Sequence, residues 1–202
     1  MNTSDDDARH AEKMRKIKDA RDKMMAAKTI EKGLLIVHTG KGKGKSTAAF
    51  GMAMRGIGHQ MRIGIVQFIK GAIETGESAV LNAFPEQVTM KRMGEGFTWE
   101  TQDKTRDIAA AGAAWAEAKS MIASGDYDMV ILDELNIALR YDYVDIDEVV
   151  AFLKARPAGV HVVVTGRNAK EPLIEAADLV TEMTMVKHPF RDGVKPQAGI
   201  EF

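Results

Sequence analysis

The sequence predicts an α/β fold with a mainly parallel β-sheet flanked by helices, and two patterns along the chain lead to this prediction. From residue 34 onward, short runs rich in β-branched residues are apolar at successive positions, which is typical of strands buried on both faces. Alanine-rich or amphipathic segments separate these runs and suit the crossover helices of βαβ units. The 202 residues, of which 45% are hydrophobic, are enough for one globular domain with its own core.

The same patterns place the individual elements along the chain. Strong apolar runs predict strands at residues 34–37, 63–68, 129–132 and 160–164. Weaker runs predict strands at residues 88–90 and 179–185. The helices between them are expected at residues 47–55, 107–123 and 146–155. Because no internal repeat or low-complexity linker interrupts this series, residues 33–202 are expected to form a single domain.

Residues 1–32 differ in composition from the rest and are expected to form a charged helical arm. Half of these residues are charged, and apolar side chains recur every three or four positions in one narrow stripe. The stripe consists of Met14, Ile17, Ala20, Met24 and Ala27. Two interpretations fit: a solvated extension with frayed ends, or an arm that docks on its own domain or on a neighbouring subunit.

Composition excludes several classes of function. The chain has no cysteine, which removes disulfides, thiolate metal sites and thiol nucleophiles. It has no apolar run of about eighteen residues and no apolar segment of a secretory signal at its start, so we expect a cytoplasmic protein that does not span a membrane. A formal net charge of -1 provides no overall positive field, so no nucleic-acid partner is expected.

Residues 36–50, IVHTGKGKGKSTAAF, show the order of a phosphate loop: an apolar strand, a loop rich in glycine and lysine, and an alanine-rich helix. The loop glycines can adopt positive φ and carry no Cβ, so backbone N–H groups can converge on phosphate oxygens. These glycines are Gly40, Gly42 and Gly44. Lys45 is expected to reach the phosphates and Ser46 to place its hydroxyl on Mg²⁺, with Thr47 at the helix N-terminus that faces the anion.

The loop is a variant of the usual motif and carries extra charge. The strict spacing requires glycine five residues before Gly44, where Thr39 stands instead. Two further lysines, Lys41 and Lys43, lie beside Lys45, and three like charges so close raise the free energy unless a polyanion neutralises them. A whole triphosphate would do so. The alternative, that Lys41 and Lys43 point into water, stays open.

The second half of the site is expected at the end of the strand predicted at residues 129–132. Asp133 and Glu134 follow this strand directly, and in a parallel sheet the carboxyl end faces the phosphate loop. One carboxylate would hold Mg²⁺ directly or through water, and the other would do the same or act as a base. The alternative is an ordinary helix N-terminus, where acidic residues are favoured anyway.

Six blocks of sequence together resemble the P-loop type of corrinoid adenosyltransferase over essentially residues 33–202. They are HTGKGKGKSTAAFGMAMRGIGH (38–59), VQFIKG (66–71), GFTWET (96–101), LDEL (132–135), VVTGR (163–167) and VKHPFRDGVKPQAGIEF (186–202). The resemblance implies a RecA-like P-loop NTPase fold. It also implies transfer of the 5′-deoxyadenosyl group of ATP to Co(I) of a reduced corrinoid, with release of triphosphate. The nucleophile is then the substrate's cobalt, in agreement with the absence of cysteine.

The resemblance also implies roles for particular residues. In the family, ATP lies reversed in the loop and presents C5′ to the cobalt, so Lys41, Lys43, Lys45 and Mg²⁺ would neutralise the leaving triphosphate. Lys45 and Glu134 are the expected catalytic residues. The expected Mg²⁺ set is Ser46 and Glu134, with Asp133 behind Glu134.

Two aromatic residues and two arginines complete the candidate site. Phe97 and Trp99 match family positions that pack on the lower face of the corrin ring and displace its axial ligand, although an isolated pair of this kind more often anchors a loop. Arg167 is expected to contact ATP, as is Arg55, for which a surface position is the alternative. Weaker candidates in the last matched block are His188 and Arg191.

The resemblance further implies a homodimer in which the N-terminal helix covers the active site, and a reduced flavoprotein is a plausible electron donor. It does not separate complete cobalamin from an earlier a,c-diamide corrinoid as the substrate. Two other functions fit the phosphate loop alone. One is a RecA-like ATPase or ATP-driven switch in which Glu134 polarises water, and the other is a regulator that binds ATP without turnover.

Overall fold

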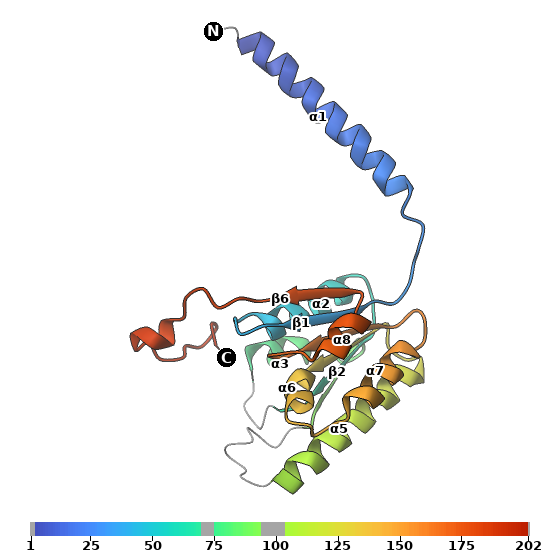
Figure 1. Ribbon diagram of the computed structural model, residues 1–202, viewed down its shortest axis with the longest axis vertical. Coiled ribbons are helices and arrows are strands. Elements are labelled where there is room, and N and C mark those ends of the chain that lie inside the picture. Colours follow the sequence, from blue (N-terminus) through green and yellow to red (C-terminus); the bar gives the residue numbers. More distant parts are fainter. Residues whose placement is uncertain (1–2, 70–74, 94–103, 202) are drawn as a thin grey trace. The chain divides into compact units, whose positions relative to one another are not determined.

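A parallel β-sheet forms the centre of the computed structural model, which describes residues 3–69, 75–93 and 104–201 (Figure 1). Within these residues the sheet has six strands in the order β3-β2-β4-β5-β1-β6, and every neighbouring pair is parallel. The strands are β1 (Leu35–Thr39), β2 (Ile63–Gln67), β3 (Val88–Arg92), β4 (Met129–Asp133), β5 (His161–Thr165) and β6 (Leu179–Glu182). All six predicted strands are therefore present, and the last is shorter than expected.

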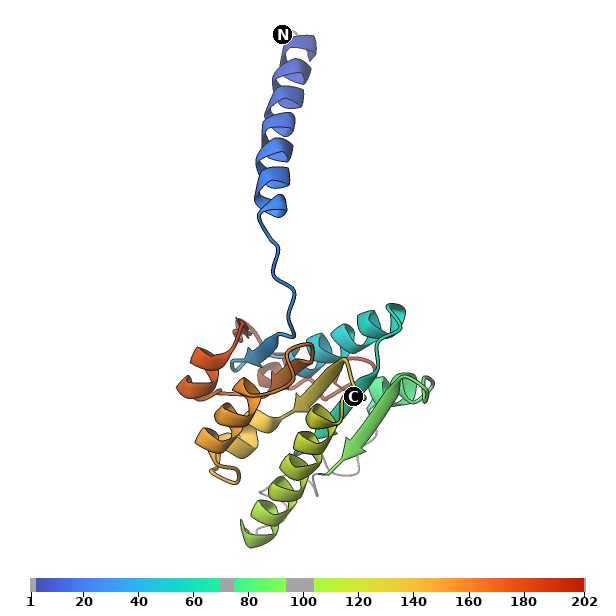
Figure 2. The ribbon, with the colours of Figure 1, turned by 90° about the vertical axis from the view of Figure 1, so that its right-hand side faces the viewer.

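Helices cover both faces of this sheet (Figure 2). The long helices α2 (Lys45–Gly58), α5 (Lys104–Ser124) and α7 (Ile146–Lys154) confirm the three helices predicted after the arm. Shorter helices follow other strands: α3 (Gly76–Leu81), α6 (Leu135–Arg140), α8 (Glu171–Ala176) and the 3₁₀ helix η1 (Pro189–Asp192). These were not predicted, because four to six residues are too few to show a helical period.

Alternation along each strand divides the core into two layers. Ile36 of β1 belongs to the core cluster that contains Phe50 and Ala53 of α2, whereas Leu35 and Val37 belong to the second cluster, which contains buried residues of α5 and α7. All five residues of β1, β2 and β4 are buried, as expected for strands covered on both faces. The predicted α/β fold with a mainly parallel sheet is thus confirmed.

The phosphate loop follows β1 and is tied to the chain that leaves β6. The N–H of Met183 donates to the carbonyl of Thr39 at 2.9 Å, and the N–H of Gly42 donates to the carbonyl of Met183 at 2.6 Å. A Cβ on Gly42 would lie only 2.7 Å from that same carbonyl oxygen, so the close approach requires glycine. A distant strand therefore holds the loop in place.

The N-terminal arm, Met1–Glu31, is one of two compact units of the chain, and Lys32–Phe202 is the other. Its helix α1 (Thr3–Ala26) agrees with the helix predicted from the spacing of apolar residues. Met14, Ile17 and Met24 of the narrow stripe are exposed. Within the part of the chain that the structure describes, no helix is both long and apolar enough to cross a membrane.

Candidate active site

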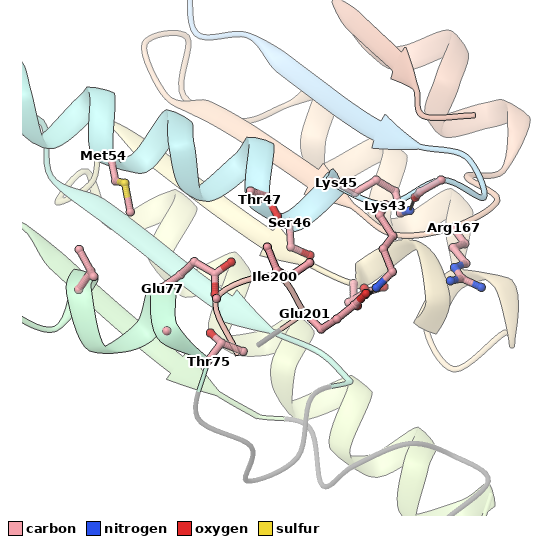
Figure 3. A pocket seen from close by; sticks show the side chains of 16 residues that line it. Lys43, Lys45, Ser46, Thr47, Met54, Thr75, Glu77, Arg167, Ile200 and Glu201 are labelled. Carbon is pink, nitrogen blue, oxygen red and sulfur yellow. Dashed lines mark hydrogen bonds and ion pairs between the residues drawn. The ribbon is translucent and has the colours of Figure 1, made fainter. Parts of the chain in front are cut away.

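A cavity of about 480 Å³ lies against the phosphate loop (Figure 3). It is bounded by the loop with the start of α2, by the start of α3, by the turns after β4 and β5, and by the C-terminal segment. The lining residues are 42–47, Met54, 75–77, Val80, Glu134, Arg167 and 199–201. The structure thus brings together residues from five separate parts of the sequence.

Eight of the predicted site residues line this cavity: Gly42, Lys43, Gly44, Lys45, Ser46, Thr47, Glu134 and Arg167. Four others do not. Lys41 is exposed, Arg55 is exposed in the last turn of α2, Gly40 lies at the base of the loop, and Asp133 lies buried behind it. Phe97 and Trp99 lie outside the described residues.

The phosphate loop has the backbone that its glycines predict. Gly40 and Gly44 have φ of 94° and 100°, values that residues with a Cβ rarely adopt. Gly44 stands at the N-cap of α2, and its carbonyl accepts the N–H of Ala48 at 2.8 Å. The Lys45 ammonium donates to the carbonyl of Gly42, so the lysine folds back over its own loop and its side chain is buried.

Positive charge is concentrated on one side of the cavity. Burial lowers the pKa of Lys45, the positive charges of Arg167 and Lys43 lower it further, and Glu134 opposes the shift. Burial and Arg167 also lower the pKa of Lys43. The charged ammonium forms of Lys43 and Lys45 therefore raise the free energy of the site, and an anionic ligand would lower it. Such a cluster suits a polyphosphate.

Glu201 supplies a carboxylate to this cluster from the far end of the chain. It forms an ion pair with Lys43, and Gly199 and Ile200 line the cavity beside it (Figure 3). This contact was missed at the sequence level. The C-terminal block belongs to the family resemblance, but no spacing in it indicates that Glu201 meets the phosphate loop.

The two acidic residues after β4 have different environments. Asp133 is fully buried: its Oδ1 accepts the Thr165 hydroxyl at 2.8 Å, and its Oδ2 accepts the Gln67 amide at 3.0 Å. Glu134 is half-buried, has φ of 65° and lines the cavity. Of the two, only Glu134 is placed to meet a ligand directly.

The weaker candidates near the C-terminus border a second cavity of about 200 Å³, which shares Lys43, Ile200 and Glu201 with the first. His188 lines it, and its Nδ1 accepts the N–H of Phe190 at 3.2 Å at the start of η1. This is a capping contact. Arg191 is exposed and lies outside the lining of both cavities.

His38, at the end of β1, was not singled out as a functional residue, and its environment is unusual. It is 7% exposed, and within the described residues neither ring nitrogen has a hydrogen-bond partner. Burial lowers the pKa of its imidazole below the usual 6.5. The ring is therefore held neutral in the fold at a cost in stability.

We expect His38→Phe to raise the free energy of unfolding by about 1 kcal/mol at pH 7.5, because it removes buried polar atoms without partners. Below pH 6.5 the His38 imidazole becomes protonated in the unfolded wild type but stays neutral in the folded state. The free energy of unfolding of the wild type therefore falls as the pH drops. The advantage of His38→Phe should therefore grow between pH 6.5 and 5.5. Urea unfolding across this pH range measures it.

His161→Phe is the matched control for this prediction. The Nδ1 of His161 accepts the N–H of Leu34 at 3.1 Å, so the same substitution there should destabilise the protein. Equal effects of the two substitutions would contradict the role assigned to the unpartnered ring of His38.

The fold and the site together define a P-loop nucleotide-binding protein of the α/β class. Among solved structures, the flagellar accessory protein FlaH from Methanocaldococcus jannaschii is similar, with a TM-score of 0.53, 13% identity and coverage of 77% of this chain and 73% of that chain. This similarity concerns the fold alone and agrees with the expected RecA-like P-loop architecture.

Residues 31–202 match the family ATP:corrinoid adenosyltransferase BtuR/CobO/CobP, and residues 1–25 match Cob(I)alamin adenosyltransferase N terminal. The chain belongs to this family of corrinoid adenosyltransferases. A corrinoid adenosyltransferase of Sinorhizobium sp. is 61% identical over 199 residues, covering 98% of this chain and 93% of the relative. One from Pseudomonas aeruginosa is 55% identical over 203 residues, covering 100% of both, and corrinoid adenosyltransferase CobA of Salmonella typhimurium is 45% identical over 196, covering 97% and 99%.

Family membership decides among the functions that the phosphate loop alone left open. The protein is a transferase of cobalamin biosynthesis that binds ATP and transfers its adenosyl group to a corrinoid. The prediction of a corrinoid adenosyltransferase is confirmed, and the ATPase and regulator alternatives are set aside.

Proposed function

We propose that ATP binds in the 480 Å³ cavity with its triphosphate on the phosphate loop and its C5′ facing the corrinoid. The observation that supports this is that Lys43, Lys45 and Arg167 all line the cavity and lie on the same side of it (Figure 3). The electron pair of Co(I) would form the Co–C5′ bond while the C5′–O bond breaks, and inorganic triphosphate would leave with that bond's electrons. Positive groups along the whole triphosphate then stabilise the leaving group.

Lys43 and Lys45 would change partners when ATP binds. Lys45 now donates to the carbonyl of Gly42, and Lys43 pairs with Glu201. Phosphate oxygens accept stronger, charge-assisted hydrogen bonds than a neutral carbonyl does. We propose that the triphosphate replaces both partners, with Arg167 contacting it from the turn after β5. Lys41, exposed on the same loop, and Arg55 remain predicted contacts.

We propose Mg²⁺ as the metal that accompanies ATP. The hydroxyl of Ser46 and the carboxylate of Glu134 line one cavity and are the oxygen donors that Mg²⁺ prefers, together with substrate phosphates. When bound, Mg²⁺ would neutralise charge on the triphosphate. Thr47, near the N-terminus of α2, would face the same anion. Asp133 is buried behind Glu134 and would support its position.

The corrinoid side of the site rests on the resemblance. We propose that Phe97 and Trp99 pack on the lower face of the corrin ring and displace its axial ligand, which would make Co(II) easier to reduce. A reduced flavoprotein would supply the electron. Because Co(I) persists only under reducing conditions, we keep the cytoplasm as the proposed location.

The N-terminal arm and a homodimer belong to the same proposal. We propose that the arm, residues 1–32, contributes to corrinoid binding in its own or a neighbouring subunit. The exposed apolar stripe with Met14, Ile17 and Met24 supports this, since it offers a surface for contact.

Deletion of residues 1–28 should leave the ATP affinity within about twofold, because the phosphate loop and the other residues that line the cavity all belong to the unit Lys32–Phe202. The corrinoid KM should rise or the turnover fall by about tenfold, as expected when an interaction of about 1.4 kcal/mol is lost. Steady-state kinetics with each substrate varied in turn separates the two effects. An unchanged corrinoid KM and kcat would rule out a role for the arm.

The reaction itself is tested by incubating the protein anaerobically with ATP, Mg²⁺ and chemically reduced cob(I)alamin. Light-sensitive adenosylcobalamin and one equivalent of inorganic triphosphate would support attack at C5′. Release of ADP and phosphate with no alkylated cobalt would contradict attack at C5′.

A further inference from the structure

A row of polar side chains crosses the carboxyl ends of the central strands behind the cavity. Strand register pairs Gln67 of β2 with Asp133 of β4, and Thr165 of β5 with His38 of β1. None of the four is more than 7% exposed. A buried polar row of this kind is costly unless its members satisfy one another, and three of them do so through hydrogen bonds.

The hydroxyl of Thr165 is both a hydrogen-bond donor and a hydrogen-bond acceptor. It donates to Oδ1 of Asp133 at 2.8 Å and accepts the backbone N–H of Glu134 at 2.9 Å. Oδ2 of Asp133 accepts the Gln67 amide, so the buried carboxylate is held at both oxygens. The hydroxyl therefore links a fixed anchor to the backbone of the residue that enters the cavity.

The backbone of Glu134 needs such a link. Its φ of 65° is uncommon for a residue with a side chain, and a conformation of this kind persists only where its surroundings enforce it. The start of α6 contributes a second tie, because the side-chain amide of Asn136 donates to the carbonyl of Gly166 at 3.1 Å. The turns after β4 and β5 are thus joined at two points.

We propose that Thr165 is the positioning residue for Glu134, and that Asp133 acts as the buried anchor of Thr165 rather than as a ligand of the metal. This inference rests on the proposed role of Glu134 toward Mg²⁺. The Thr165 hydroxyl holds the turn after β4 so that Glu134 lines the cavity to which Ser46 also contributes. Second-layer groups of this kind commonly govern the orientation of metal ligands.

The test is the affinity for Mn²⁺ in the presence of ATP and without corrinoid, measured by electron paramagnetic resonance on the full-length chain. Thr165→Val keeps the shape of the side chain but removes both hydrogen bonds, and it should weaken Mn²⁺ binding by about tenfold. Thr165→Ser retains the hydroxyl and should stay within about twofold of the wild type. ATP affinity measured in EDTA should be unchanged in both variants.

Wild-type Mn²⁺ affinity in Thr165→Val, or equal losses in the valine and serine variants, would overturn the inference. Glu134→Gln separates it from the proposed function: unchanged metal affinity in that variant would remove Glu134 from the metal site. A loss in Glu134→Gln without a loss in Thr165→Val would defeat the positioning role alone.

Hydrogen exchange on the wild type provides a second test, which does not depend on whether a substituted protein folds. The Glu134 amide should exchange as slowly as the amides of β4, because the buried Thr165 hydroxyl accepts its hydrogen. Rapid exchange at Glu134 beside a protected β4 would show that the hydrogen bond does not hold this turn.

Discussion

Lys45→Ala is expected to lower kcat/KM for ATP by about a thousandfold. Hydrogen bonds to charged groups contribute about 1.5–3 kcal/mol, so loss of the ammonium alone should weaken ATP binding by about 10- to 100-fold. Loss of a positive group beside the leaving triphosphate should lower turnover further. Isothermal titration with ATP and single-turnover formation of adenosylcobalamin measure the two parts separately.

Stability should respond in the opposite direction to activity. Burial lowers the pKa of Lys45, which means that the charged ammonium is held in the fold at a cost. In the absence of ATP, Lys45→Ala should therefore unfold at the same temperature as the wild type or a higher one. Lys154→Ala, on the exposed last turn of α7, is the control and should change neither property. Retained ATP affinity in Lys45→Ala would mean that the loop is not the nucleotide site.

Gly166→Ala should damage both folding and catalysis. The φ of Gly166 is 125°, which side chains rarely adopt, and a Cβ there would lie 2.8 Å from Cβ of Asn136 and 3.3 Å from Oε2 of Glu134. Backbone strain and overpacking each cost about 1–3 kcal/mol, so we expect a loss of about 2–6 kcal/mol in the free energy of unfolding. Displacement of Glu134 should also lower kcat by at least about tenfold in the folded fraction.

Gly125→Ala is the matched control, because Gly125 also has positive φ, at 76°, but a Cβ there would meet nothing within 4 Å. It should cost only the backbone strain, about 1–2 kcal/mol, and leave kcat unchanged. Denaturant unfolding and steady-state turnover of the two variants compare the effects. Equal losses of stability and equal kcat values would show that crowding at Glu134 has no consequence.

Much of the architecture follows from local pattern. The continuous apolar runs at residues 34–37 and 129–132 predict strands buried on both faces, and β1 and β4 are buried throughout. Short helices such as α6 and α8 carry too few residues for a period to emerge, and their positions became known only from the structure. The order of the strands in the sheet could not be predicted from the apolar pattern either, since the last strand, β6, lies beside the first, β1.

The candidate site divides in the same way. The phosphate loop is a local motif, so Lys45, Ser46 and the strained glycines could be predicted from consecutive residues. Asp133 and Glu134 could also be predicted from one strand end, with Asp133 behind Glu134, but the residues that hold Asp133 could not. Asp133 is closed off by Gln67 and Thr165, which lie 66 and 32 residues away in the chain.

The sequence by itself determined that this protein has a parallel α/β fold, a phosphate loop and the blocks of a corrinoid adenosyltransferase, because each depends on neighbouring residues. Only the tertiary structure decided that Gln67 and Thr165 hold the buried Asp133, that Glu201 meets Lys43, and that Met183 braces the loop. These contacts join segments far apart in the chain, and the sheet topology that brings them together leaves no periodic trace in the sequence.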